Sequence, residues 1–295
     1  MLLFRPGLST LVLGLALDTA SGSDVLHGTI SDGAKVFAMI SADRAAYSVP
    51  TNPAPPALAR RYTAAFPARS SAQTGIGPSG FPQGDGVAIA SVQTNGSMRI
   101  TGRLADGSRV ALSSALSKEN TFPLHVTTDR NRGSLSGLVT FRDLPGVSDF
   151  DSADLAWFKS MDLSRKIYPS GWPGGIGTDL VGSAFVGQPA LPGLSPPSPE
   201  GNAVVSFSGV GIGTILEKSL NIDPRSRARV IGIDDDRLKL RLSGKVGAFG
   251  AVLKDAAGHR RVRGLGVILQ KQRLGTGFFI EDGRSGGILL RPRTP

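Results

Sequence analysis

Cysteine is absent from all 295 residues of the chain. That absence excludes disulfide bridges, thiolate nucleophiles and thiolate metal ligands. Histidine is scarce, and its three positions lie far from one another, without the spacings that bring metal ligands together on one element. These positions are His27, His125 and His259. We therefore expect no metal, no cofactor and no metal-dependent chemistry.

Aromatic residues are also few, at 6% of the chain, with three Tyr and two Trp. The formal net charge is +10, but the Lys and Arg residues are scattered along alternating segments, and so few rings leave little for base stacking. The composition argues against nucleic acid, and a generic basic outer face is the simpler interpretation. A glycan, another cell-surface component or neighbouring domains of a larger protein are the partners that we expect.

Long apolar runs are missing, since none approaches the roughly 20 residues of a membrane-spanning helix. Residues 1–23 allow two interpretations. Arg5, an apolar stretch over 8–17 and small residues at 20–22 outline a secretory signal, although the A-x-A cleavage pattern is missing. Alternation of leucines over 11–17 favours instead a β-strand, in a chain that begins inside a fold whose earlier strands are missing.

Glycine and proline are abundant, at 39 and 20 residues, and both interrupt helices and supply turns. Residues 87–116 alternate apolar and polar side chains with period two, which is typical of half-buried strands. Asn95-Gly96 and Asp106-Gly107 divide this segment, and both dipeptides favour tight hairpin turns. The segment predicts a three-stranded antiparallel meander.

The same design recurs along the chain. Residues 26–36 match 100–110 in their Gly, Asp-Gly and Val positions, and further hairpins are predicted around Ala257-Gly258 and Asp282-Gly283. Gly28 and Gly102 stand on the apolar face, where glycine marks the bends that close a barrel. The fold class predicted is all-β, an antiparallel hairpin meander forming one or more closed or partly closed barrels.

The alternation also predicts which side chains face inward. The buried set is Leu104, Val110, Leu112, Leu238, Leu240 and Leu242, and the exposed set is Arg99, Arg103, Lys239 and Arg241. A register error of one residue would invert both sets.

Pro-, Ala- and Gly-rich stretches set the expected domain organisation. We expect a β-meander segment over 1–186 with a long loop at 48–86, a Pro-rich linker over 187–201 and a C-terminal β segment over 202–295 that packs with the first. Neither 48–86 nor 168–201 is expected to hold a central strand, and 168–186 is expected to be a loop. Tyr168 and Trp172, in the second loop, are the possible ligand contacts, because their rings suit sugar stacking.

Catalytic motifs have simpler explanations. Gly283-Arg284-Ser285-Gly286-Gly287 fits the serine hydrolase string, but no histidine follows it, so a turn is the better interpretation. Gly75 to Gly80 fits a phosphate-binding string, but Pro78 argues against the helix that it needs. Asp234-Asp235-Asp236 lacks further calcium ligands and predicts an acidic turn. No catalytic residue is predicted.

The chain resembles an uncharacterised β-rich region, often C-terminal, of large extracellular proteins from planctomycete-like and verrucomicrobia-like bacteria. The resemblance extends over nearly the whole chain, in matching order. The strings that carry it are 26–33, 42–45, 51–55, 101–107, 116–118, 133–137, 266–272, 277–279 and 285–286. It implies a secreted or cell-surface setting and a meander-like β fold, and it implies no chemistry.

These observations favour a non-enzymatic binding or structural spacer module of a bacterial secreted or cell-surface protein. One alternative is a polysaccharide-acting hydrolase that uses two carboxylates far apart in sequence, recognisable by their separation across a cleft. Another is an outer-membrane β-barrel, although so few Tyr and Trp would not fill the aromatic girdles of such barrels.

Overall fold

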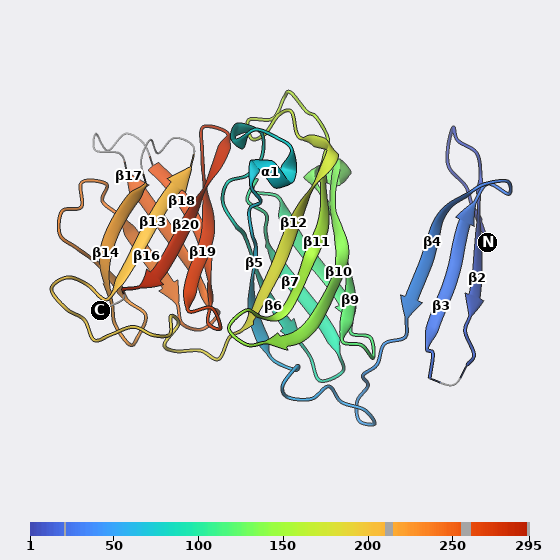
Figure 1. The fold of residues 1–295 in the computed structure, drawn as a ribbon, viewed down its shortest axis with the longest axis horizontal. Coiled ribbons are helices and arrows are strands. Elements are labelled where there is room, and N and C mark those ends of the chain that lie inside the picture. The colour runs from blue at the N-terminus through green and yellow to red at the C-terminus, as the bar shows by residue number, and fades with distance from the viewer. Residues whose placement is uncertain (21, 210–214, 255–260, 294–295) are drawn as a thin grey trace.

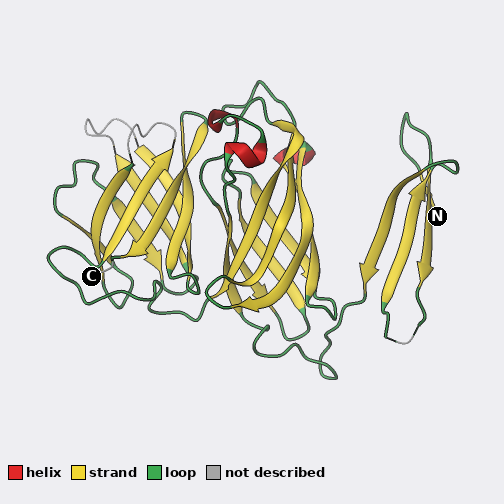
Figure 2. Ribbon diagram, viewed as in Figure 1, coloured by secondary structure: helices red, strands yellow, loops and turns green. Residues whose placement is uncertain are grey.

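The computed structural model describes residues 1–20, 22–209, 215–254 and 261–293, which form three antiparallel sheets (Figures 1 and 2). Helical structure in these residues is limited to the single turns α1 (Ser71–Thr74), η1 (Pro78–Gly80) and η2 (Asp129–Asn131). The all-β, hairpin-based fold predicted from the sequence is confirmed. None of the helical turns in the described ranges has the length and hydropathy to cross a bilayer.

The N-terminal sheet has four strands in chain order and stands to one side of the other two sheets (blue in Figure 1). Its strands are β1 (Leu2–Leu3), β2 (Leu11–Leu17), β3 (Val25–Ser31) and β4 (Val36–Asp43). Residues 11–17 thus form the strand that their alternation favoured, paired along β3. Leu15 and Leu17 of this strand remain exposed.

The second sheet has eight strands in the order β8-β7-β6-β5-β12-β11-β10-β9, and it is a nearly closed barrel. Its strands are β5 (Arg61–Phe66), β6 (Gly86–Val92), β7 (Ser97–Arg103), β8 (Arg109–Ala115), β9 (Thr121–Thr128), β10 (Gly133–Leu144), β11 (Ser148–Lys159) and β12 (Trp172–Ala184). We call it the first barrel. The meander predicted over 87–116 is confirmed as β6, β7 and β8.

The prediction that 48–86 and 168–201 lack a central strand is wrong. β5 and β12 come from these segments, and they pair with each other in the middle of the sheet. Residues 61–66 contain neither Pro nor Gly, so the prolines that flank them do not disturb the ladder. In β12, Pro173 and its following glycines lie within a register shift against β11, between the pairs Trp157–Ile176 and Lys159–Trp172. A bulge there removes the need for a regular ladder.

The third sheet also has eight strands, in the order β15-β14-β13-β20-β19-β18-β17-β16, and is the second barrel. Its strands are β13 (Ala203–Gly209), β14 (Leu216–Ile222), β15 (Ala228–Ile231), β16 (Lys239–Ser243), β17 (Ala248–Lys254), β18 (Arg261–Leu269), β19 (Leu274–Glu281) and β20 (Arg284–Pro292). Residues 187–201 run between β12 and β13. The turn predicted at Ala257-Gly258 lies outside the described residues.

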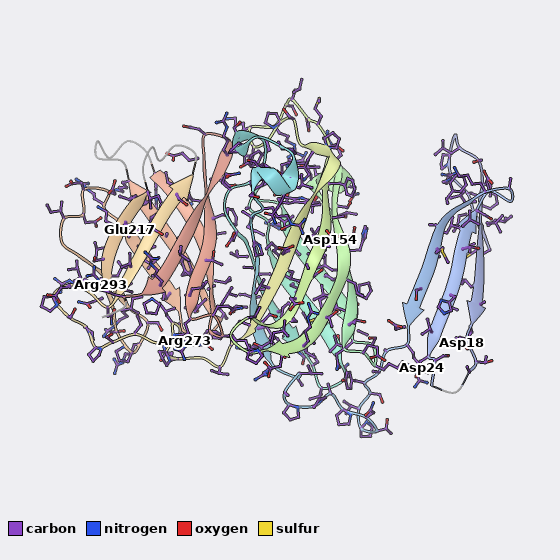
Figure 3. All side chains as sticks on the ribbon, viewed as in Figure 1. Asp18, Asp24, Asp154, Glu217, Arg273 and Arg293 are labelled. Atoms are coloured by element: carbon purple, nitrogen blue, oxygen red, sulfur yellow. The ribbon has the colours of Figure 1, made fainter. Side chains whose placement is uncertain are left out.

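The structure confirms the predicted strand register, because the buried and exposed sets are not inverted. Leu104, Val110, Leu238 and Leu240 are buried, and Arg99, Lys239 and Arg241 are exposed. Three members of the two sets are half-buried instead. They are Leu112, Leu242 and Arg103. Apolar side chains therefore fill both barrels, whereas charged side chains such as Asp154 on β11 and Glu217 on β14 lie on the outside (Figure 3).

The two barrels pack side by side through β5 and β6 of the first and β18 and β19 of the second. A small apolar cluster joins them, made of Ala65, Val87, Ala105, Val267, Leu269 and Phe278. Asp85 links the barrels by accepting hydrogen bonds from the Ala68 amide at 2.9 Å and the Thr276 hydroxyl at 2.5 Å. This contact fixes the end of β19 beside the first barrel.

Glycine is required at two positions of the β7–β8 hairpin. A Cβ on Gly102 would lie 2.1 Å from the Val87 carbonyl oxygen, so the close approach of β6 and β7 depends on its absence. Gly107 has a φ of 86° in the turn, as does Gly33 at 94° in the matching N-terminal hairpin. The positive φ predicted for both turn glycines is confirmed.

Replacing Gly107 by Val is expected to lower the free energy of unfolding by about 1 to 3 kcal/mol, because a β-branched residue is strained at positive φ. The new Cβ would also lie 3.2 Å from Cδ1 of Ile280. Denaturant unfolding of the variant measures the loss. The matched change at Gly33, where a Cβ meets nothing within 4 Å, isolates the backbone contribution.

Candidate cationic binding site

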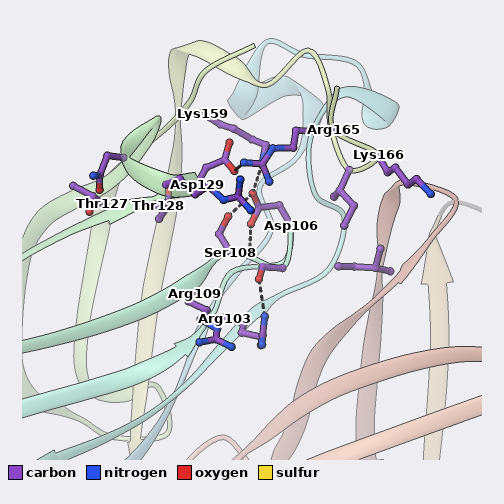
Figure 4. Close-up of a pocket in the computed structure, with 15 residues that line it drawn as sticks. Arg103, Asp106, Ser108, Arg109, Thr127, Thr128, Asp129, Lys159, Arg165 and Lys166 are labelled. Carbon is purple, nitrogen blue, oxygen red and sulfur yellow. Dashed lines mark hydrogen bonds and ion pairs between the residues drawn. The ribbon is translucent and has the colours of Figure 1, made fainter. Parts of the chain in front are cut away.

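An open pocket of about 730 Å³ lies at one end of the first barrel (Figure 4). Four segments form it: the β7–β8 turn, the η2 turn after β9, the end of β11 and the loop over 160–171. Ile280 of β19 closes one side. The site therefore depends on the first barrel and on its contact with the second.

Charge is the main property of this pocket. Six of its lining residues are basic and two are acidic, which is a formal excess of four positive charges. The basic residues are Arg103, Arg109, Arg130, Lys159, Arg165 and Lys166, and the acidic ones are Asp106 and Asp129. We call this set the cationic pocket.

The floor of the cationic pocket is a buried ion pair. Lys159 Nζ lies 2.8 Å from Asp106 Oδ2, and the two side chains are only 7% and 1% exposed. Asp106 also accepts hydrogen bonds from the amide and the hydroxyl of Ser108, at 2.8 and 2.9 Å. Lys159 Nζ lies 5.8 Å from the centroid of the Trp172 ring. Both charges are thus fully engaged within the protein.

Arg165 is also engaged with carboxylates. Its guanidinium lies 2.7 Å from Asp129 Oδ1 and 3.2 Å from Asp162 Oδ2. Arg132 pairs with Asp162 at 2.9 Å. These pairs tie the loop over 160–171 to the η2 turn. They also leave neither of the two pocket carboxylates free, which argues against paired acid–base catalysis here.

Asp162 is the organising carboxylate of this loop. Hydrogen bonds from Ser164, together with Arg165 and Arg132, lower the pKa of Asp162 from 3.8 to about 2. Because the pKa of Asp162 is lower in the folded than in the unfolded chain, its ionised carboxylate stabilises the fold. This contribution is fully present above the unfolded-state pKa near 4 and is lost as the pH falls through about 2.

We expect the Asp162 carboxylate to remain ionised at pH 3, where ordinary aspartates are largely protonated. A ¹³C NMR titration of the aspartate carboxyl carbons measures this directly. An Asp162 midpoint near 4 would show that Ser164 and the two arginines do not hold the loop in solution.

The η2 turn is held in an uncommon conformation at the rim of the pocket. Asp129, Arg130 and Asn131 have φ angles of 49°, 57° and 68°. Asp and Asn tolerate this left-handed region, but Arg seldom adopts it, and such a residue costs of order 1 to 3 kcal/mol. Backbone strain of this kind clusters at binding sites. The turn places the exposed Arg130 on the pocket rim.

Three of the basic residues have no ion-pair partner among the described residues: Arg109, Arg130 and Lys166. Arg103 donates to the Gly107 carbonyl at 2.9 Å, and it stands directly opposite Arg109 across the hairpin. Like charges on opposed positions repel each other. An anion between them would relieve that repulsion, so the arrangement is suited to bind an anionic group.

The predicted ligand contacts lie near this site but beneath it. Tyr168 and Trp172 are 4% and 2% exposed, and their rings pack edge to face at 5.7 Å. Tyr168 also contacts Ser285, accepting a hydrogen bond from its amide at 2.9 Å. Neither ring presents a face to solvent, so the expectation of sugar stacking is corrected. Bulky aromatic side chains fill this end of the core instead.

The other motifs take the structural roles expected of them. Ser285 is fully buried in β20, just after the Asp282-Gly283 turn, and its hydroxyl lies 3.1 Å from that of Tyr168. Asp234 accepts the Leu238 amide in a turn, and Asp236 pairs with Lys218 at 2.8 Å. Trp157 lies in the core on β11. Within the described ranges, no three His, Asp or Glu side chains gather as metal ligands.

Only some residues of the cationic pocket could be predicted from the sequence to lie close together. Arg103 and Arg109 flank the Asp106-Gly107 turn, so their proximity followed from the hairpin. Lys159 and Arg165 come from segments 50 or more residues further along the chain, so no local pattern indicated their proximity to the β7–β8 turn. Only the closed barrel brings these residues together.

Comparisons with known proteins give little further information. No family model matches the chain, and no curated protein matches it. One similar solved structure is the crystal structure of a protein with unknown function from the DUF3598 family of Nostoc punctiforme PCC 73102. It shares 12% sequence identity, covers 81% of this chain and 97% of its own, and has a TM-score of 0.19. A TM-score this low carries no argument about function.

Proposed function

We propose that the chain is a non-catalytic binding module of a bacterial secreted or cell-surface protein, and that its cationic pocket binds an anionic group of a surface glycan. The observation that carries the proposal is the charge of the pocket, with six basic and two acidic side chains around an open volume of about 730 Å³. This volume lies within the range of small-molecule sites.

The pocket contains both paired and unpaired basic side chains, and the unpaired ones support a binding role. Lys159 pairs with Asp106 and Arg165 pairs with Asp129, so these four side chains hold the walls of the pocket in place. Arg109, Arg130 and Lys166 remain for a ligand. Guanidinium groups bind carboxylate, sulfate and phosphate oxygens through paired hydrogen bonds, which makes arginine well suited to acidic sugars.

A glycan array that includes uronic acid, sulfated and neutral oligosaccharides tests the proposal. We expect binding to the acidic members, weakened by added salt, and no binding to the neutral ones. Equal retention of acidic and neutral oligosaccharides, or retention of none, would refute the proposal.

A further inference from the structure

A second open site lies in the second barrel, at the seam between β15 and β16. These strands are the two ends of the sheet order, and the bridge between Arg227 and Arg241 is the pairing recorded between them. A groove of about 560 Å³ follows the seam. We call it the seam groove. It lies on a different barrel from the cationic pocket, so this inference does not depend on the proposed function.

The floor of the seam groove is the core of the second barrel. Leu220, Leu238 and Leu240 line it, and they are 0%, 5% and 7% exposed. The half-buried Ala228 and Val230 form the β15 side and pack against the same core. An apolar group that entered the groove would therefore contact a continuous hydrocarbon surface and be removed from water.

The rim of the seam groove is basic. Arg227, Lys239 and Arg241 line it, and none of its described lining residues is acidic. Arg227 pairs with Asp223 at 2.6 Å, whereas Lys239 and Arg241 have no ion-pair partner in the described parts of the chain. Both of these side chains are exposed. An apolar floor beneath a basic rim is complementary to a ligand with a hydrocarbon chain and one anionic head.

We propose that the seam groove binds a single-chain amphiphile with an anionic head, of the fatty acid class. The alkyl chain lies along Leu238, Leu240 and Val230, and the carboxylate is held by Lys239 and Arg241. Alternation from Leu238 into β16 explains this arrangement, since Leu238 and Leu240 are buried while Lys239 and Arg241 are exposed.

The test is a titration of the full chain with dodecanoate below its micellar concentration, followed by calorimetry. Dodecanol and dodecyltrimethylammonium serve as neutral and cationic ligands of the same chain length. We expect saturable binding of dodecanoate, with affinity reduced about tenfold or more for dodecanol, because the alcohol cannot make charge-assisted hydrogen bonds to Lys239 and Arg241.

Variants locate the site. Lys239→Glu and Arg241→Glu are each expected to reduce dodecanoate affinity at least about tenfold, and Ala228→Phe is expected to block binding by filling the groove. Arg99→Glu, an equal charge change at an exposed position of the first barrel, is expected to leave dodecanoate affinity unchanged. Circular dichroism shows which variants retain the fold. Equal binding of all three amphiphiles, no binding, or binding unaffected in folded Lys239 and Arg241 variants would overturn the proposal.

Discussion

Lys159→Met is expected to lower the free energy of unfolding by about 3 to 5 kcal/mol, since it leaves the Asp106 carboxylate buried without its cation. The carboxylate is 1% exposed, so water cannot replace the lost partner. Its remaining donors are the amide and hydroxyl of Ser108. Such a loss is a large part of the 5 to 15 kcal/mol that typically stabilises a domain.

A double-mutant cycle separates the ion pair from the packing of the lysine stem. Asp106→Asn keeps an oxygen for the Ser108 amide and removes the charge. We expect the Lys159→Met, Asp106→Asn double variant to be more stable than Lys159→Met alone, because no unpaired charge stays buried. Lys245→Met, at an exposed position, is the control and should change stability by less than about 0.5 kcal/mol. Additive losses in the cycle would contradict the buried pair.

Arg109→Glu and Arg130→Glu are each expected to weaken binding of an acidic oligosaccharide by about 10- to 100-fold. Each change removes a charge-assisted hydrogen bond of about 1.5 to 3 kcal/mol and adds a repulsive carboxylate. Both side chains are exposed and unpaired among the described residues, so the fold should survive. Calorimetric titration at two salt concentrations measures the loss and its electrostatic origin.

Arg99→Glu is the matched control for these variants. Arg99 lies on β7, the same strand as Arg103, but it is exposed outside the cationic pocket. Arg99→Glu changes the net charge by the same amount as Arg109→Glu and Arg130→Glu. An equal loss of affinity in Arg99→Glu would show that the basic surface as a whole attracts the ligand, and the assignment to the pocket would then be wrong.

Local pattern was sufficient to predict the hairpins. Period-two alternation together with Asn-Gly and Asp-Gly turns predicted β6 to β8, and the leucine alternation at 238–242 predicted the inward face of β16. These features depend on neighbouring residues, so the sequence displays them directly. The same local reasoning failed for β5 and β12. Their Pro- and Gly-rich surroundings argued against strands, and pairing across 116 or more residues of chain decided the outcome.

The cationic pocket required the tertiary fold. The Asp106-Gly107 turn was predicted, but nothing in the sequence indicated that Asp106 pairs with Lys159, 53 residues away. Likewise, the left-handed Arg130 carries no sequence signature, since its conformation is imposed by the turn between β9 and β10. Tyr168 and Trp172 were predicted as possible ligand contacts of a loop, but the folded barrel buries both rings.

A crystal structure of the chain with a bound uronic acid oligosaccharide tests the central claim most directly. We expect a carboxylate of the ligand in the cationic pocket, within hydrogen-bond distance of Arg109 and Arg130, with the Lys159–Asp106 pair unchanged beneath it. An oligosaccharide bound at another surface, with the pocket left to solvent, would contradict the account.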